Sequence, residues 1–534
     1  IDIDVRVFHG LSIRRRHLHA GRRIDQETGA VEKVETVSVA IDGLWQIAAG
    51  GPLFAVLVGL IIGVVVGVLP GLGPLLGVTL AIPFTFSMDP VTGVALLMGI
   101  YQGGSYGGAL TAIILGIPGT PIAAATLLDG RPMAQRGEAS MAVSLATLAS
   151  WFGGCLGGLS LLLFAPYLAE FALDFGPAEI FCLALLGLTA IATLSEESAV
   201  KGLLAGVFGL LFAAIGTDPY TGISRFNFGI TELSGGITFV ALLVGLFAIP
   251  EVLAQLERPF SNTRSSILIS FKFQAFRTVI GKFFTYARSS LVGVTVGAVP
   301  GIGGVVSSFL SYKLTRDLAK DKSRFGKGEP DGVIATEAAN SATTGGALIP
   351  MLSLGIPGDP IVAVMMGGLL VHGITPGPAL FLTSGDVVAG IFAAFLVGAI
   401  LLLPLAILLV PIFVQILKIP NRLLLVVVLF LAIYGTYAVH GRMFDLWTML
   451  AFGALGYFFV RTRIPRAPLI IGFVLGPVVE VNLRRMSSLA SHDPVGYLLS
   501  RPVSMVILTI ALLFLFYPII ARYRSHATAA KRTQ

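Results

Sequence analysis

The chain contains few charged residues and few cysteines for its length. Of its 534 residues only 12% are Asp, Glu, Lys or Arg, whereas 55% are hydrophobic and the mean hydropathy is +0.88. Water-soluble globular proteins carry roughly 25% charged residues, so the composition excludes that class. The two cysteines, Cys155 and Cys182, lie far apart in apolar stretches, which argues against a disulfide framework or a cysteine metal site. Apolar runs of membrane-spanning length recur between residues 44 and 520 and predict an all-α polytopic membrane protein with about 11 to 14 membrane segments.

Basic residues are missing from two long stretches, 34–130 and 328–417. Lys and Arg gather in loops that stay in the cytoplasm, so the net charge of +7 reports topology, and we expect no nucleic-acid partner. Basic clusters flank residues 289–312 on both sides. Both ends of this apolar segment are therefore expected in the cytoplasm, and we predict a re-entrant hairpin with its tip at the Pro-Gly pair 300–301.

A second Pro-Gly pair, at residues 70–71, has no basic flank. One of the two related segments is thus flanked by basic residues and the other is not. This difference predicts repeats of inverted topology, which enter the membrane from opposite sides. The alternative is that residues 44–69 form one ordinary spanning helix.

Helix-breaking elements occur twice in the same order, which indicates an internal duplication. Duplicated apolar segments interrupted by Gly and Pro are the best sequence indication of the binding site of a secondary transporter. The elements are Pro-Gly at 70–71 and 300–301, Gly-Gly-Ala-Leu at 107–110 and 345–348, and Gly-Ile-Pro-Gly-Xaa-Pro at 116–121 and 355–360.

Charge and hydropathy divide the chain into five parts. A basic polar N-terminal extension, without the apolar core of a signal peptide, is expected before the first membrane repeat. The parts are the extension (1–43), the first repeat (44–256), a basic cytoplasmic or interfacial connector (257–288), the second repeat (289–520) and a basic tail (521–534).

The predicted binding site consists of glycines at the breaks and of polar residues beside them. A break frees backbone N–H groups at the start of the next half-helix, and these groups, with the helix dipole, can hold an anion without a cationic side chain. The freed carbonyls at the opposite half-helix end suit Na⁺, which is the one cofactor we consider. The predicted substrate-binding residues are Gly71, Gly73, Gln102, Ser105, Gly119, Thr120, Gly301, Gly303, Asn340, Ser341, Thr343, Thr344 and Gly358.

Two acids, Glu337 and Asp359, are candidates for coupling to a cation, because a carboxylate inside the membrane is costly and usually functional. Glu337 lies one helical turn before Asn340, and Asp359 stands where the first copy has Thr120. The alternatives are that both acids are solvated at the membrane interface and that the hydroxyl and amide groups only join helices.

Other function classes find little support in the sequence. The glycine-rich segment 70–73 is not followed by the Gly-Lys-Ser/Thr of a nucleotide-binding loop. A membrane-embedded enzyme needs a nucleophile–base pair or a metal cluster, and we identify no catalytic residue. An ion channel is the second rival, which gradient-driven accumulation of substrate would exclude.

At these motifs the sequence resembles the large membrane subunit of the tripartite tricarboxylate transporter family, from about residue 44 to 517. The resemblance is carried, in order, by GVLPGLGP (67–74), GIYQGGSYGG (99–108), LAEFALDFGPAE (168–179), GLFA (245–248), EAANSA (337–342) and FDLW (444–447).

The resemblance implies an elevator-like fold in the bacterial inner membrane and cation-driven uptake of a tricarboxylate or dicarboxylate. It implies two partners, a small membrane subunit and a periplasmic solute-binding protein. The chain departs from the family pattern in its extension and at Ser341, where a second Asn is expected.

Overall fold

The computed structural model describes residues 42–48, 50–69, 71–193, 198–218, 220–257, 269–301, 303–416, 419, 421–490 and 493–530. The predicted extension up to residue 41, residues 258–268 of the connector and residues 531–534 of the tail lie outside the described residues. Pro70 and Ile302 of the two Pro-Gly elements lie outside them as well.

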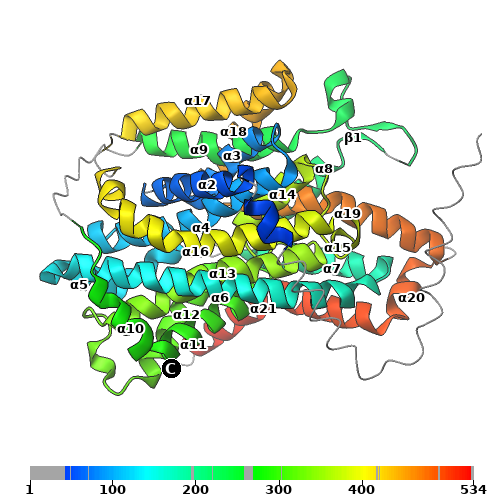
Figure 1. Ribbon diagram of the computed structural model, residues 1–534. Coiled ribbons are helices and arrows are strands. Elements are labelled where there is room, and N and C mark those ends of the chain that lie inside the picture. The colour runs from blue at the N-terminus through cyan, green and yellow to red at the C-terminus, as the bar shows by residue number, and fades with distance from the viewer. Residues whose placement is uncertain are drawn as a thin grey trace, which may run out of the picture.

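The described chain is almost entirely helical (Figure 1). From residue 51 on, its α-helices are α2 (Gly51–Val68), α3 (Gly73–Thr85), α4 (Pro90–Leu115), α5 (Leu127–Met133), α6 (Ala139–Leu173), α7 (Pro177–Thr193), α8 (Ala199–Ala213), α9 (Phe239–Glu257), α10 (Phe276–Gly281), α11 (Phe283–Gly297), α12 (Gly303–Leu318), α13 (Pro330–Leu354), α14 (Pro360–Val371), α15 (Leu380–Thr383), α16 (Gly385–Ile416), α17 (Asn421–His440), α18 (Met443–Thr462), α19 (Ala467–Leu489), α20 (Pro494–Leu499) and α21 (Pro502–Ala530).

Short elements connect these helices. A two-stranded antiparallel hairpin pairs Gly216 of β1 (Gly216–Thr217) with Arg225 of β2 (Ser224–Arg225). The remaining elements are the short 3₁₀-helices η1 (Ile122–Ala124), η3 (Thr231–Gly235), η4 (Phe273–Ala275) and η5 (Lys322–Arg324) and the π-helix η2 (Ala134–Glu138).

Seven helical segments among the described residues are long and apolar enough to cross a membrane: α2, the continuous run Leu127–Leu173, α9, α16, α17, α18 and α19. Shorter apolar helices accompany them, at Gly73–Thr85, Pro177–Ala190, Ala199–Ala213, Pro360–Val371 and Pro502–Phe516. The predicted class, an all-α polytopic membrane protein, is confirmed.

Helices α2 and α4 approach each other closely along their whole contact because both carry a glycine every fourth residue. A Cβ atom on Gly59, Gly63 or Gly67 of α2 would lie 2.3–2.4 Å from a carbonyl oxygen of α4. The facing glycines of α4 are Gly99, Gly103 and Gly107. Small residues at this spacing let membrane helices pack backbone to backbone.

Helix α13 is packed in the same way between α11 and α6. A Cβ on Gly293 of α11 would lie 2.4 Å from the carbonyl oxygen of Ala339, and one on Gly153 of α6 would lie 2.2 Å from that of Ala338. Helix α3 lies against both α2 and α4, and α12 lies against both α11 and α13. The interior of the molecule is thus formed by two long helices, α4 and α13, each held between close neighbours.

Both central helices end at a glycine in the left-handed conformation, which costs glycine little. Gly116 after α4 has φ 75° and ψ 21°, and Gly355 after α13 has φ 72° and ψ 23°. The next helical turn is capped by a side chain in each case. The Thr120 hydroxyl accepts the N–H of Ala123 at 3.3 Å, and the Asp359 carboxylate accepts the N–H of Val362 at 2.8 Å.

Candidate functional site

Glu337 of α13 is fully buried and accepts three hydrogen bonds from uncharged groups. The Thr126 hydroxyl donates to Oε1, while Ser150 Oγ and Asn340 Nδ2 each donate to Oε2 at 3.3 Å. Thr126 precedes α5 and Ser150 lies on α6, so the carboxylate joins three parts of the chain. The alternative of a solvated interfacial acid is therefore wrong for Glu337.

Asn340 connects this carboxylate to the first broken helix. Its Nδ2 also donates to the backbone carbonyl of Ser105 on α4, at 3.1 Å. The Oδ1 atom of Asn340 and the hydroxyl of Ser105 are buried and have no hydrogen-bond partner within the described part of the chain. The tertiary structure thus brings Glu337, Asn340 and Ser105 together, and it leaves two oxygen atoms there without a protein partner.

Asp359 forms a second buried group, and it too is shielded from solvent, with 3% of its surface exposed. One oxygen caps α14 by accepting the N–H of Val362, and the other accepts a hydrogen bond from the Tyr101 hydroxyl of α4. Thr120, at the corresponding place of the first half, makes the equivalent cap. Asp359 therefore caps the start of a helix, and Thr120 accepts the corresponding N–H in the first half, whereas Glu337 lies within α13 and caps no helix.

Other predicted polar residues use their hydroxyl or amide groups within and between helices. Thr343 donates to the carbonyls of Ala339 at 2.7 Å and of Gly293 at 3.2 Å, and Thr344 donates to that of Ser341 at 2.6 Å. Such bonds are the helix-joining alternative considered for this patch. Their role in substrate binding stays a prediction, as does that of Ser341, which is buried on α13.

Gln102 points to a different neighbour from Ser105. Its Nε2 donates to the carbonyl of Phe395 on α16, at 2.8 Å, and its Oε1 is buried without a partner in the described residues. The amide therefore joins α4 to α16, whereas Asn340 joins α13 to α4.

The predicted glycines comprise a crowded pair, Gly119 and Gly358, and four glycines at the hairpin tips. A Cβ on Gly119 would lie 2.3 Å from the carbonyl oxygen of Gly67, and one on Gly358 would lie 2.6 Å from Cα of Ala347. Gly301 donates its N–H to the carbonyl of Gly358 at 3.0 Å. All four glycines at the hairpin tips have positive φ: Gly71 (90°), Gly73 (65°), Gly301 (86°) and Gly303 (71°).

The surroundings of the tip glycines differ. At Gly71 a Cβ would lie 2.9 Å from the Glu251 carboxylate and 3.0 Å from the Gln255 amide, both on α9. At Gly303 it would meet nothing within 4 Å. Gly303 therefore borders open space, and Gly71 is covered by polar side chains.

Three site residues were missed by the sequence prediction: Tyr101, Thr126 and Ser150. Tyr101 adjoins the predicted Gln102 and could have been included on that ground. Thr126 and Ser150 carry no local signal, because each is one hydroxyl in an apolar stretch far from Glu337 in sequence. Only the packing of the helices places them beside the acid.

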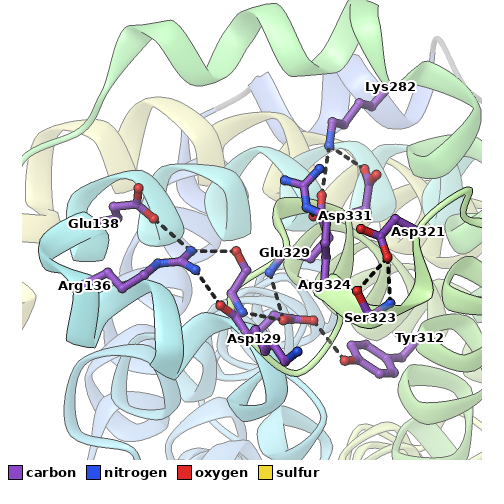
Figure 2. Close-up of polar contacts among 12 residues, drawn as sticks. Asp129, Arg136, Glu138, Lys282, Tyr312, Asp321, Ser323, Arg324, Glu329 and Asp331 are labelled. Carbon is purple, nitrogen blue, oxygen red and sulfur yellow. Dashed lines mark hydrogen bonds and ion pairs between the residues drawn. The ribbon is translucent and has the colours of Figure 1, made fainter.

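A second polar cluster lies around the start of α13 (Figure 2). Asp129 of α5 is buried and accepts the backbone N–H groups of Gly328 and Glu329, at 2.7 and 2.8 Å, and the Tyr312 hydroxyl at 2.9 Å. Arg136 donates to the carbonyls of Lys327 and Gly328, at 2.5 and 2.8 Å. In the backbone just before α13, Asp129 thus binds N–H groups and Arg136 binds carbonyl groups.

Ion pairs strengthen the start of α13. Glu329, the residue before the helix, pairs with Arg324 at 2.9 Å and with Lys282 at 3.7 Å, and Lys282 reaches Asp331 at 2.9 Å. Among the ion pairs of the described residues, none involves Glu337 or Asp359. The described residues also contain no group of three or more His, Cys, Asp or Glu side chains that could hold a metal ion.

These features define a polytopic helical membrane protein with a buried polar cluster between two broken helices. The cluster contains hydroxyl, amide and carboxyl groups. The tripartite tricarboxylate transporter TctA family model matches residues 53–471. The chain belongs to this family, and it is a membrane transporter component for tricarboxylates.

Two curated relatives come from Agrobacterium vitis. An uncharacterized 52.8 kDa protein in the TAR-I ttuC' 3' region is 37% identical over 450 residues, which cover 84% of this chain and 89% of the relative. An uncharacterized protein in the TAR-II ttuC' 3' region is 34% identical over 233 residues, covering 44% of this chain and 96% of the relative. No solved structure matches.

Proposed function

We propose that this chain is the transport subunit of a secondary transporter that imports a small tricarboxylate or dicarboxylate across the bacterial inner membrane. The observation that carries the proposal is the meeting of α4 and α13 at the hydrogen bond from Asn340 to Ser105, beside helix breaks and a buried acid. Broken helices meeting at a polar site are typical of secondary transporters. A small membrane subunit and a periplasmic solute-binding protein complete the system, as the family's tripartite character suggests.

The two halves are proposed to be inverted repeats, residues 44–256 and 289–520. Their packing supports this, because contacts recur when the halves are exchanged. Helix α6 of the first half lies along α13 and α11 of the second half, and α16 of the second half lies along α4 and α2 of the first. In the same way α9 lies along α18, and α19 lies along α8. Gly245, Pro250 and Gln255 of α9 also recur in order and spacing as Gly472, Pro477 and Asn482 of α19.

The direction of each half follows from the charged ends. The β1–β2 hairpin and α20 lie at one end of the molecule, and α5 and α10 lie at the other (Figure 1). The second end carries the basic connector, which we propose is cytoplasmic. The hairpin α11–α12 then enters from the cytoplasm, and α2–α3 enters from the opposite side.

This topology is tested by single cysteines at exposed positions, with Cys155 and Cys182 replaced by serine. Gln274→Cys and Ser323→Cys should resist a membrane-impermeant thiol reagent added to intact cells, whereas Ser224→Cys on the β1–β2 hairpin should react. Labelling of only one of the first two positions would mean that the α11–α12 segment crosses the membrane. Permeabilised cells serve as the control for reactivity at each position.

Transport itself is tested in proteoliposomes that contain both membrane subunits and the solute-binding protein. We expect labelled carboxylate to accumulate against its gradient when a Na⁺ or H⁺ gradient is imposed, and to stop when an ionophore dissipates that gradient. Downhill, non-saturable flux would instead support a channel. Chemical conversion of the carboxylate would support a membrane-embedded enzyme.

A further inference from the structure

The connector that leads into the second hairpin is basic and rich in phenylalanine. The chain carries no acidic residue between Glu257 and Asp317, whereas Lys272, Arg277 and Lys282 follow one another at intervals of five residues. The structure describes the connector from residue 269 on, as η4, α10 and the start of α11. A basic stretch without acids next to a membrane segment is complementary in charge to anionic lipid headgroups.

One side of this stretch is fixed to the body of the protein. The backbone N–H groups of Ser270 and Lys272 donate to the hydroxyls of Ser140 and Ser144 on α6, at 3.2 and 2.8 Å. Elements η4 and α10 also pack against α6. The stretch therefore has a defined position, and its other side has a defined direction.

The other side carries large apolar side chains that the described protein does not cover. Phe273, Arg277 and Ile280 are spaced by four and three residues in the helical run of η4 and α10, so they share one side of it. Phe273 is 68% exposed, Ile280 is 85% exposed, and Phe284 at the start of α11 is 82% exposed. Apolar groups gathered in this way mark a surface that binds a membrane or another protein.

Two positive charges accompany these apolar groups. The side chains of Lys272 and Arg277 are exposed and have neither an ion pair nor a hydrogen bond among the described residues. Lys282 differs, because it pairs with Asp331 at 2.9 Å and with Glu329 at 3.7 Å. Free cations beside exposed aromatic and aliphatic groups are typical of an element in the membrane interface. An anionic lipid layer supplies both matching chemistries, acyl chains for the apolar groups and phosphates for the cations.

We propose that Lys272, Phe273, Arg277, Ile280 and Phe284 form a binding face for anionic phospholipid, which we call the connector face. The three apolar side chains enter the boundary between headgroups and acyl chains, and the two cations bind headgroup phosphates. The face belongs to α10 and its neighbours, at the end of the molecule that also carries α5 (Figure 1). Lipid binding here is a property of the purified chain and does not depend on which carboxylate or ion is transported.

The charge part of the proposal is tested by thermal unfolding of the detergent-purified full chain with added phosphatidylglycerol or phosphatidylcholine. A ligand that binds only the folded state raises the unfolding temperature, and we expect a larger, saturable increase with phosphatidylglycerol. The double variant Lys272→Gln/Arg277→Gln should raise the half-saturating phosphatidylglycerol concentration about tenfold or more, because each cation near an anionic lipid surface strengthens binding. Lys313→Gln/Lys320→Gln is the matched control, since it removes two exposed charges outside the connector face.

Three results of this assay would overturn the proposal. They are equal stabilisation by the two lipids, unchanged phosphatidylglycerol affinity in Lys272→Gln/Arg277→Gln, and the same stabilisation by inorganic phosphate alone. An equal loss of affinity in the control variant would also count against it, because the effect would then follow net charge and not the connector face.

The apolar part is tested by a fluorescent probe on Ile280→Cys, with Cys155 and Cys182 replaced by serine. The highly exposed Ile280 is expected to tolerate this change. In vesicles that contain phospholipid spin-labelled on the acyl chain, the probe should be quenched, whereas a probe on Ser323→Cys, in an exposed turn, should not. Equal quenching at both positions, or none at Ile280→Cys, would contradict insertion. Loss of quenching when the small membrane subunit is added would show that a protein covers the face, which would also overturn the proposal.

Discussion

The breaks after α4 and after α13 have the same backbone but different chemistry. Gly116 and Gly355 adopt nearly the same left-handed conformation. The Thr120 hydroxyl accepts the N–H of Ala123, and the Asp359 carboxylate accepts the N–H of Val362, in each case three residues further along the chain. Glu337, which lies 18 residues before Gly355, corresponds to the apolar Met98 before Gly116. The backbone of the break is thus common to both halves, whereas Glu337 has no acidic counterpart at the corresponding position of the first half.

The hairpin tips differ as well. Gly71 is covered by Glu251 and Gln255 of α9, whereas Gly301 is bonded through its N–H to Gly358 of its own half. Side chains of α9 lie against the first tip, whereas the second tip is held by a backbone hydrogen bond.

The largest effect is expected at the crowded glycines, which should behave alike in both halves. Gly119→Leu and Gly358→Leu would place their Cβ atoms 2.3 and 2.6 Å from backbone atoms of Gly67 and Ala347, and overpacking of this kind costs about 1–3 kcal/mol or more. We expect loss of uptake and a strongly reduced yield of monodisperse protein, measured by size-exclusion chromatography.

Gly303→Ala is the control for the crowded glycines, because its Cβ would meet nothing within 4 Å. It should cost only the left-handed strain of about 1–2 kcal/mol and leave the protein monodisperse. Normal uptake by Gly119→Leu would show that the close approach to α2 is not required.

The next effect separates the two acids. Glu337→Gln should abolish the dependence of carboxylate uptake on the imposed Na⁺ or H⁺ gradient in proteoliposomes, because it removes a buried carboxyl group that forms no ion pair among the described residues. Asp359→Asn should retain that dependence, since the amide oxygen can still cap α14 or accept from Tyr101. A greater loss of ion dependence in Asp359→Asn would reverse the assignment of the two acids.

A smaller effect concerns the caps. Asp359→Ala removes both the cap and the acceptor of the Tyr101 hydroxyl, and loss of a cap typically costs about 0.5–2 kcal/mol. Asp359→Thr introduces the capping residue of the first half and should recover most of the unfolding temperature. Equal destabilisation by the alanine and threonine variants would mean that the cap contributes nothing and that Tyr101 alone needs the carboxylate.

The smallest effect is expected at two corresponding amides. Gln255 donates to Glu251 at 2.9 Å beside Gly71, whereas Asn482 donates to the carbonyl of Val478 in its own helix, at 2.8 Å, and its Oδ1 has no partner in the described residues. Gln255→Ala should lower stability by about 1 kcal/mol, the net value of a typical hydrogen bond. Asn482→Ala should hardly change the unfolding temperature in the same thermal assay. A larger loss of stability in Asn482→Ala than in Gln255→Ala would contradict a special role of Gln255 beside Gly71.

Much of the architecture follows from the sequence alone, because composition and helix breaking are local properties. Low charge and long apolar runs determine the membrane class, and glycines followed by proline determine where α4 and α13 end. The motifs also place Glu337 one turn from Asn340, since the 3.6-residue period of a helix fixes which side chains share a face. Glu337, Asn340 and Ser105 were all predicted site residues, and the structure brings these three together.

What only the tertiary structure decided is which groups meet across helices. The partners of Glu337, Thr126 and Ser150, are 211 and 187 residues away in sequence, and no local pattern marks them. The different tasks of Glu337 and Asp359 likewise depend on hydrogen bonds to other segments, as does the attachment of residues 129–136 to the start of α13. Helix periodicity acts over a few residues, whereas the packing of small-residue faces brings together positions hundreds of residues apart. The sequence therefore specified the helices and their breaks, and packing alone assembled the polar site between them.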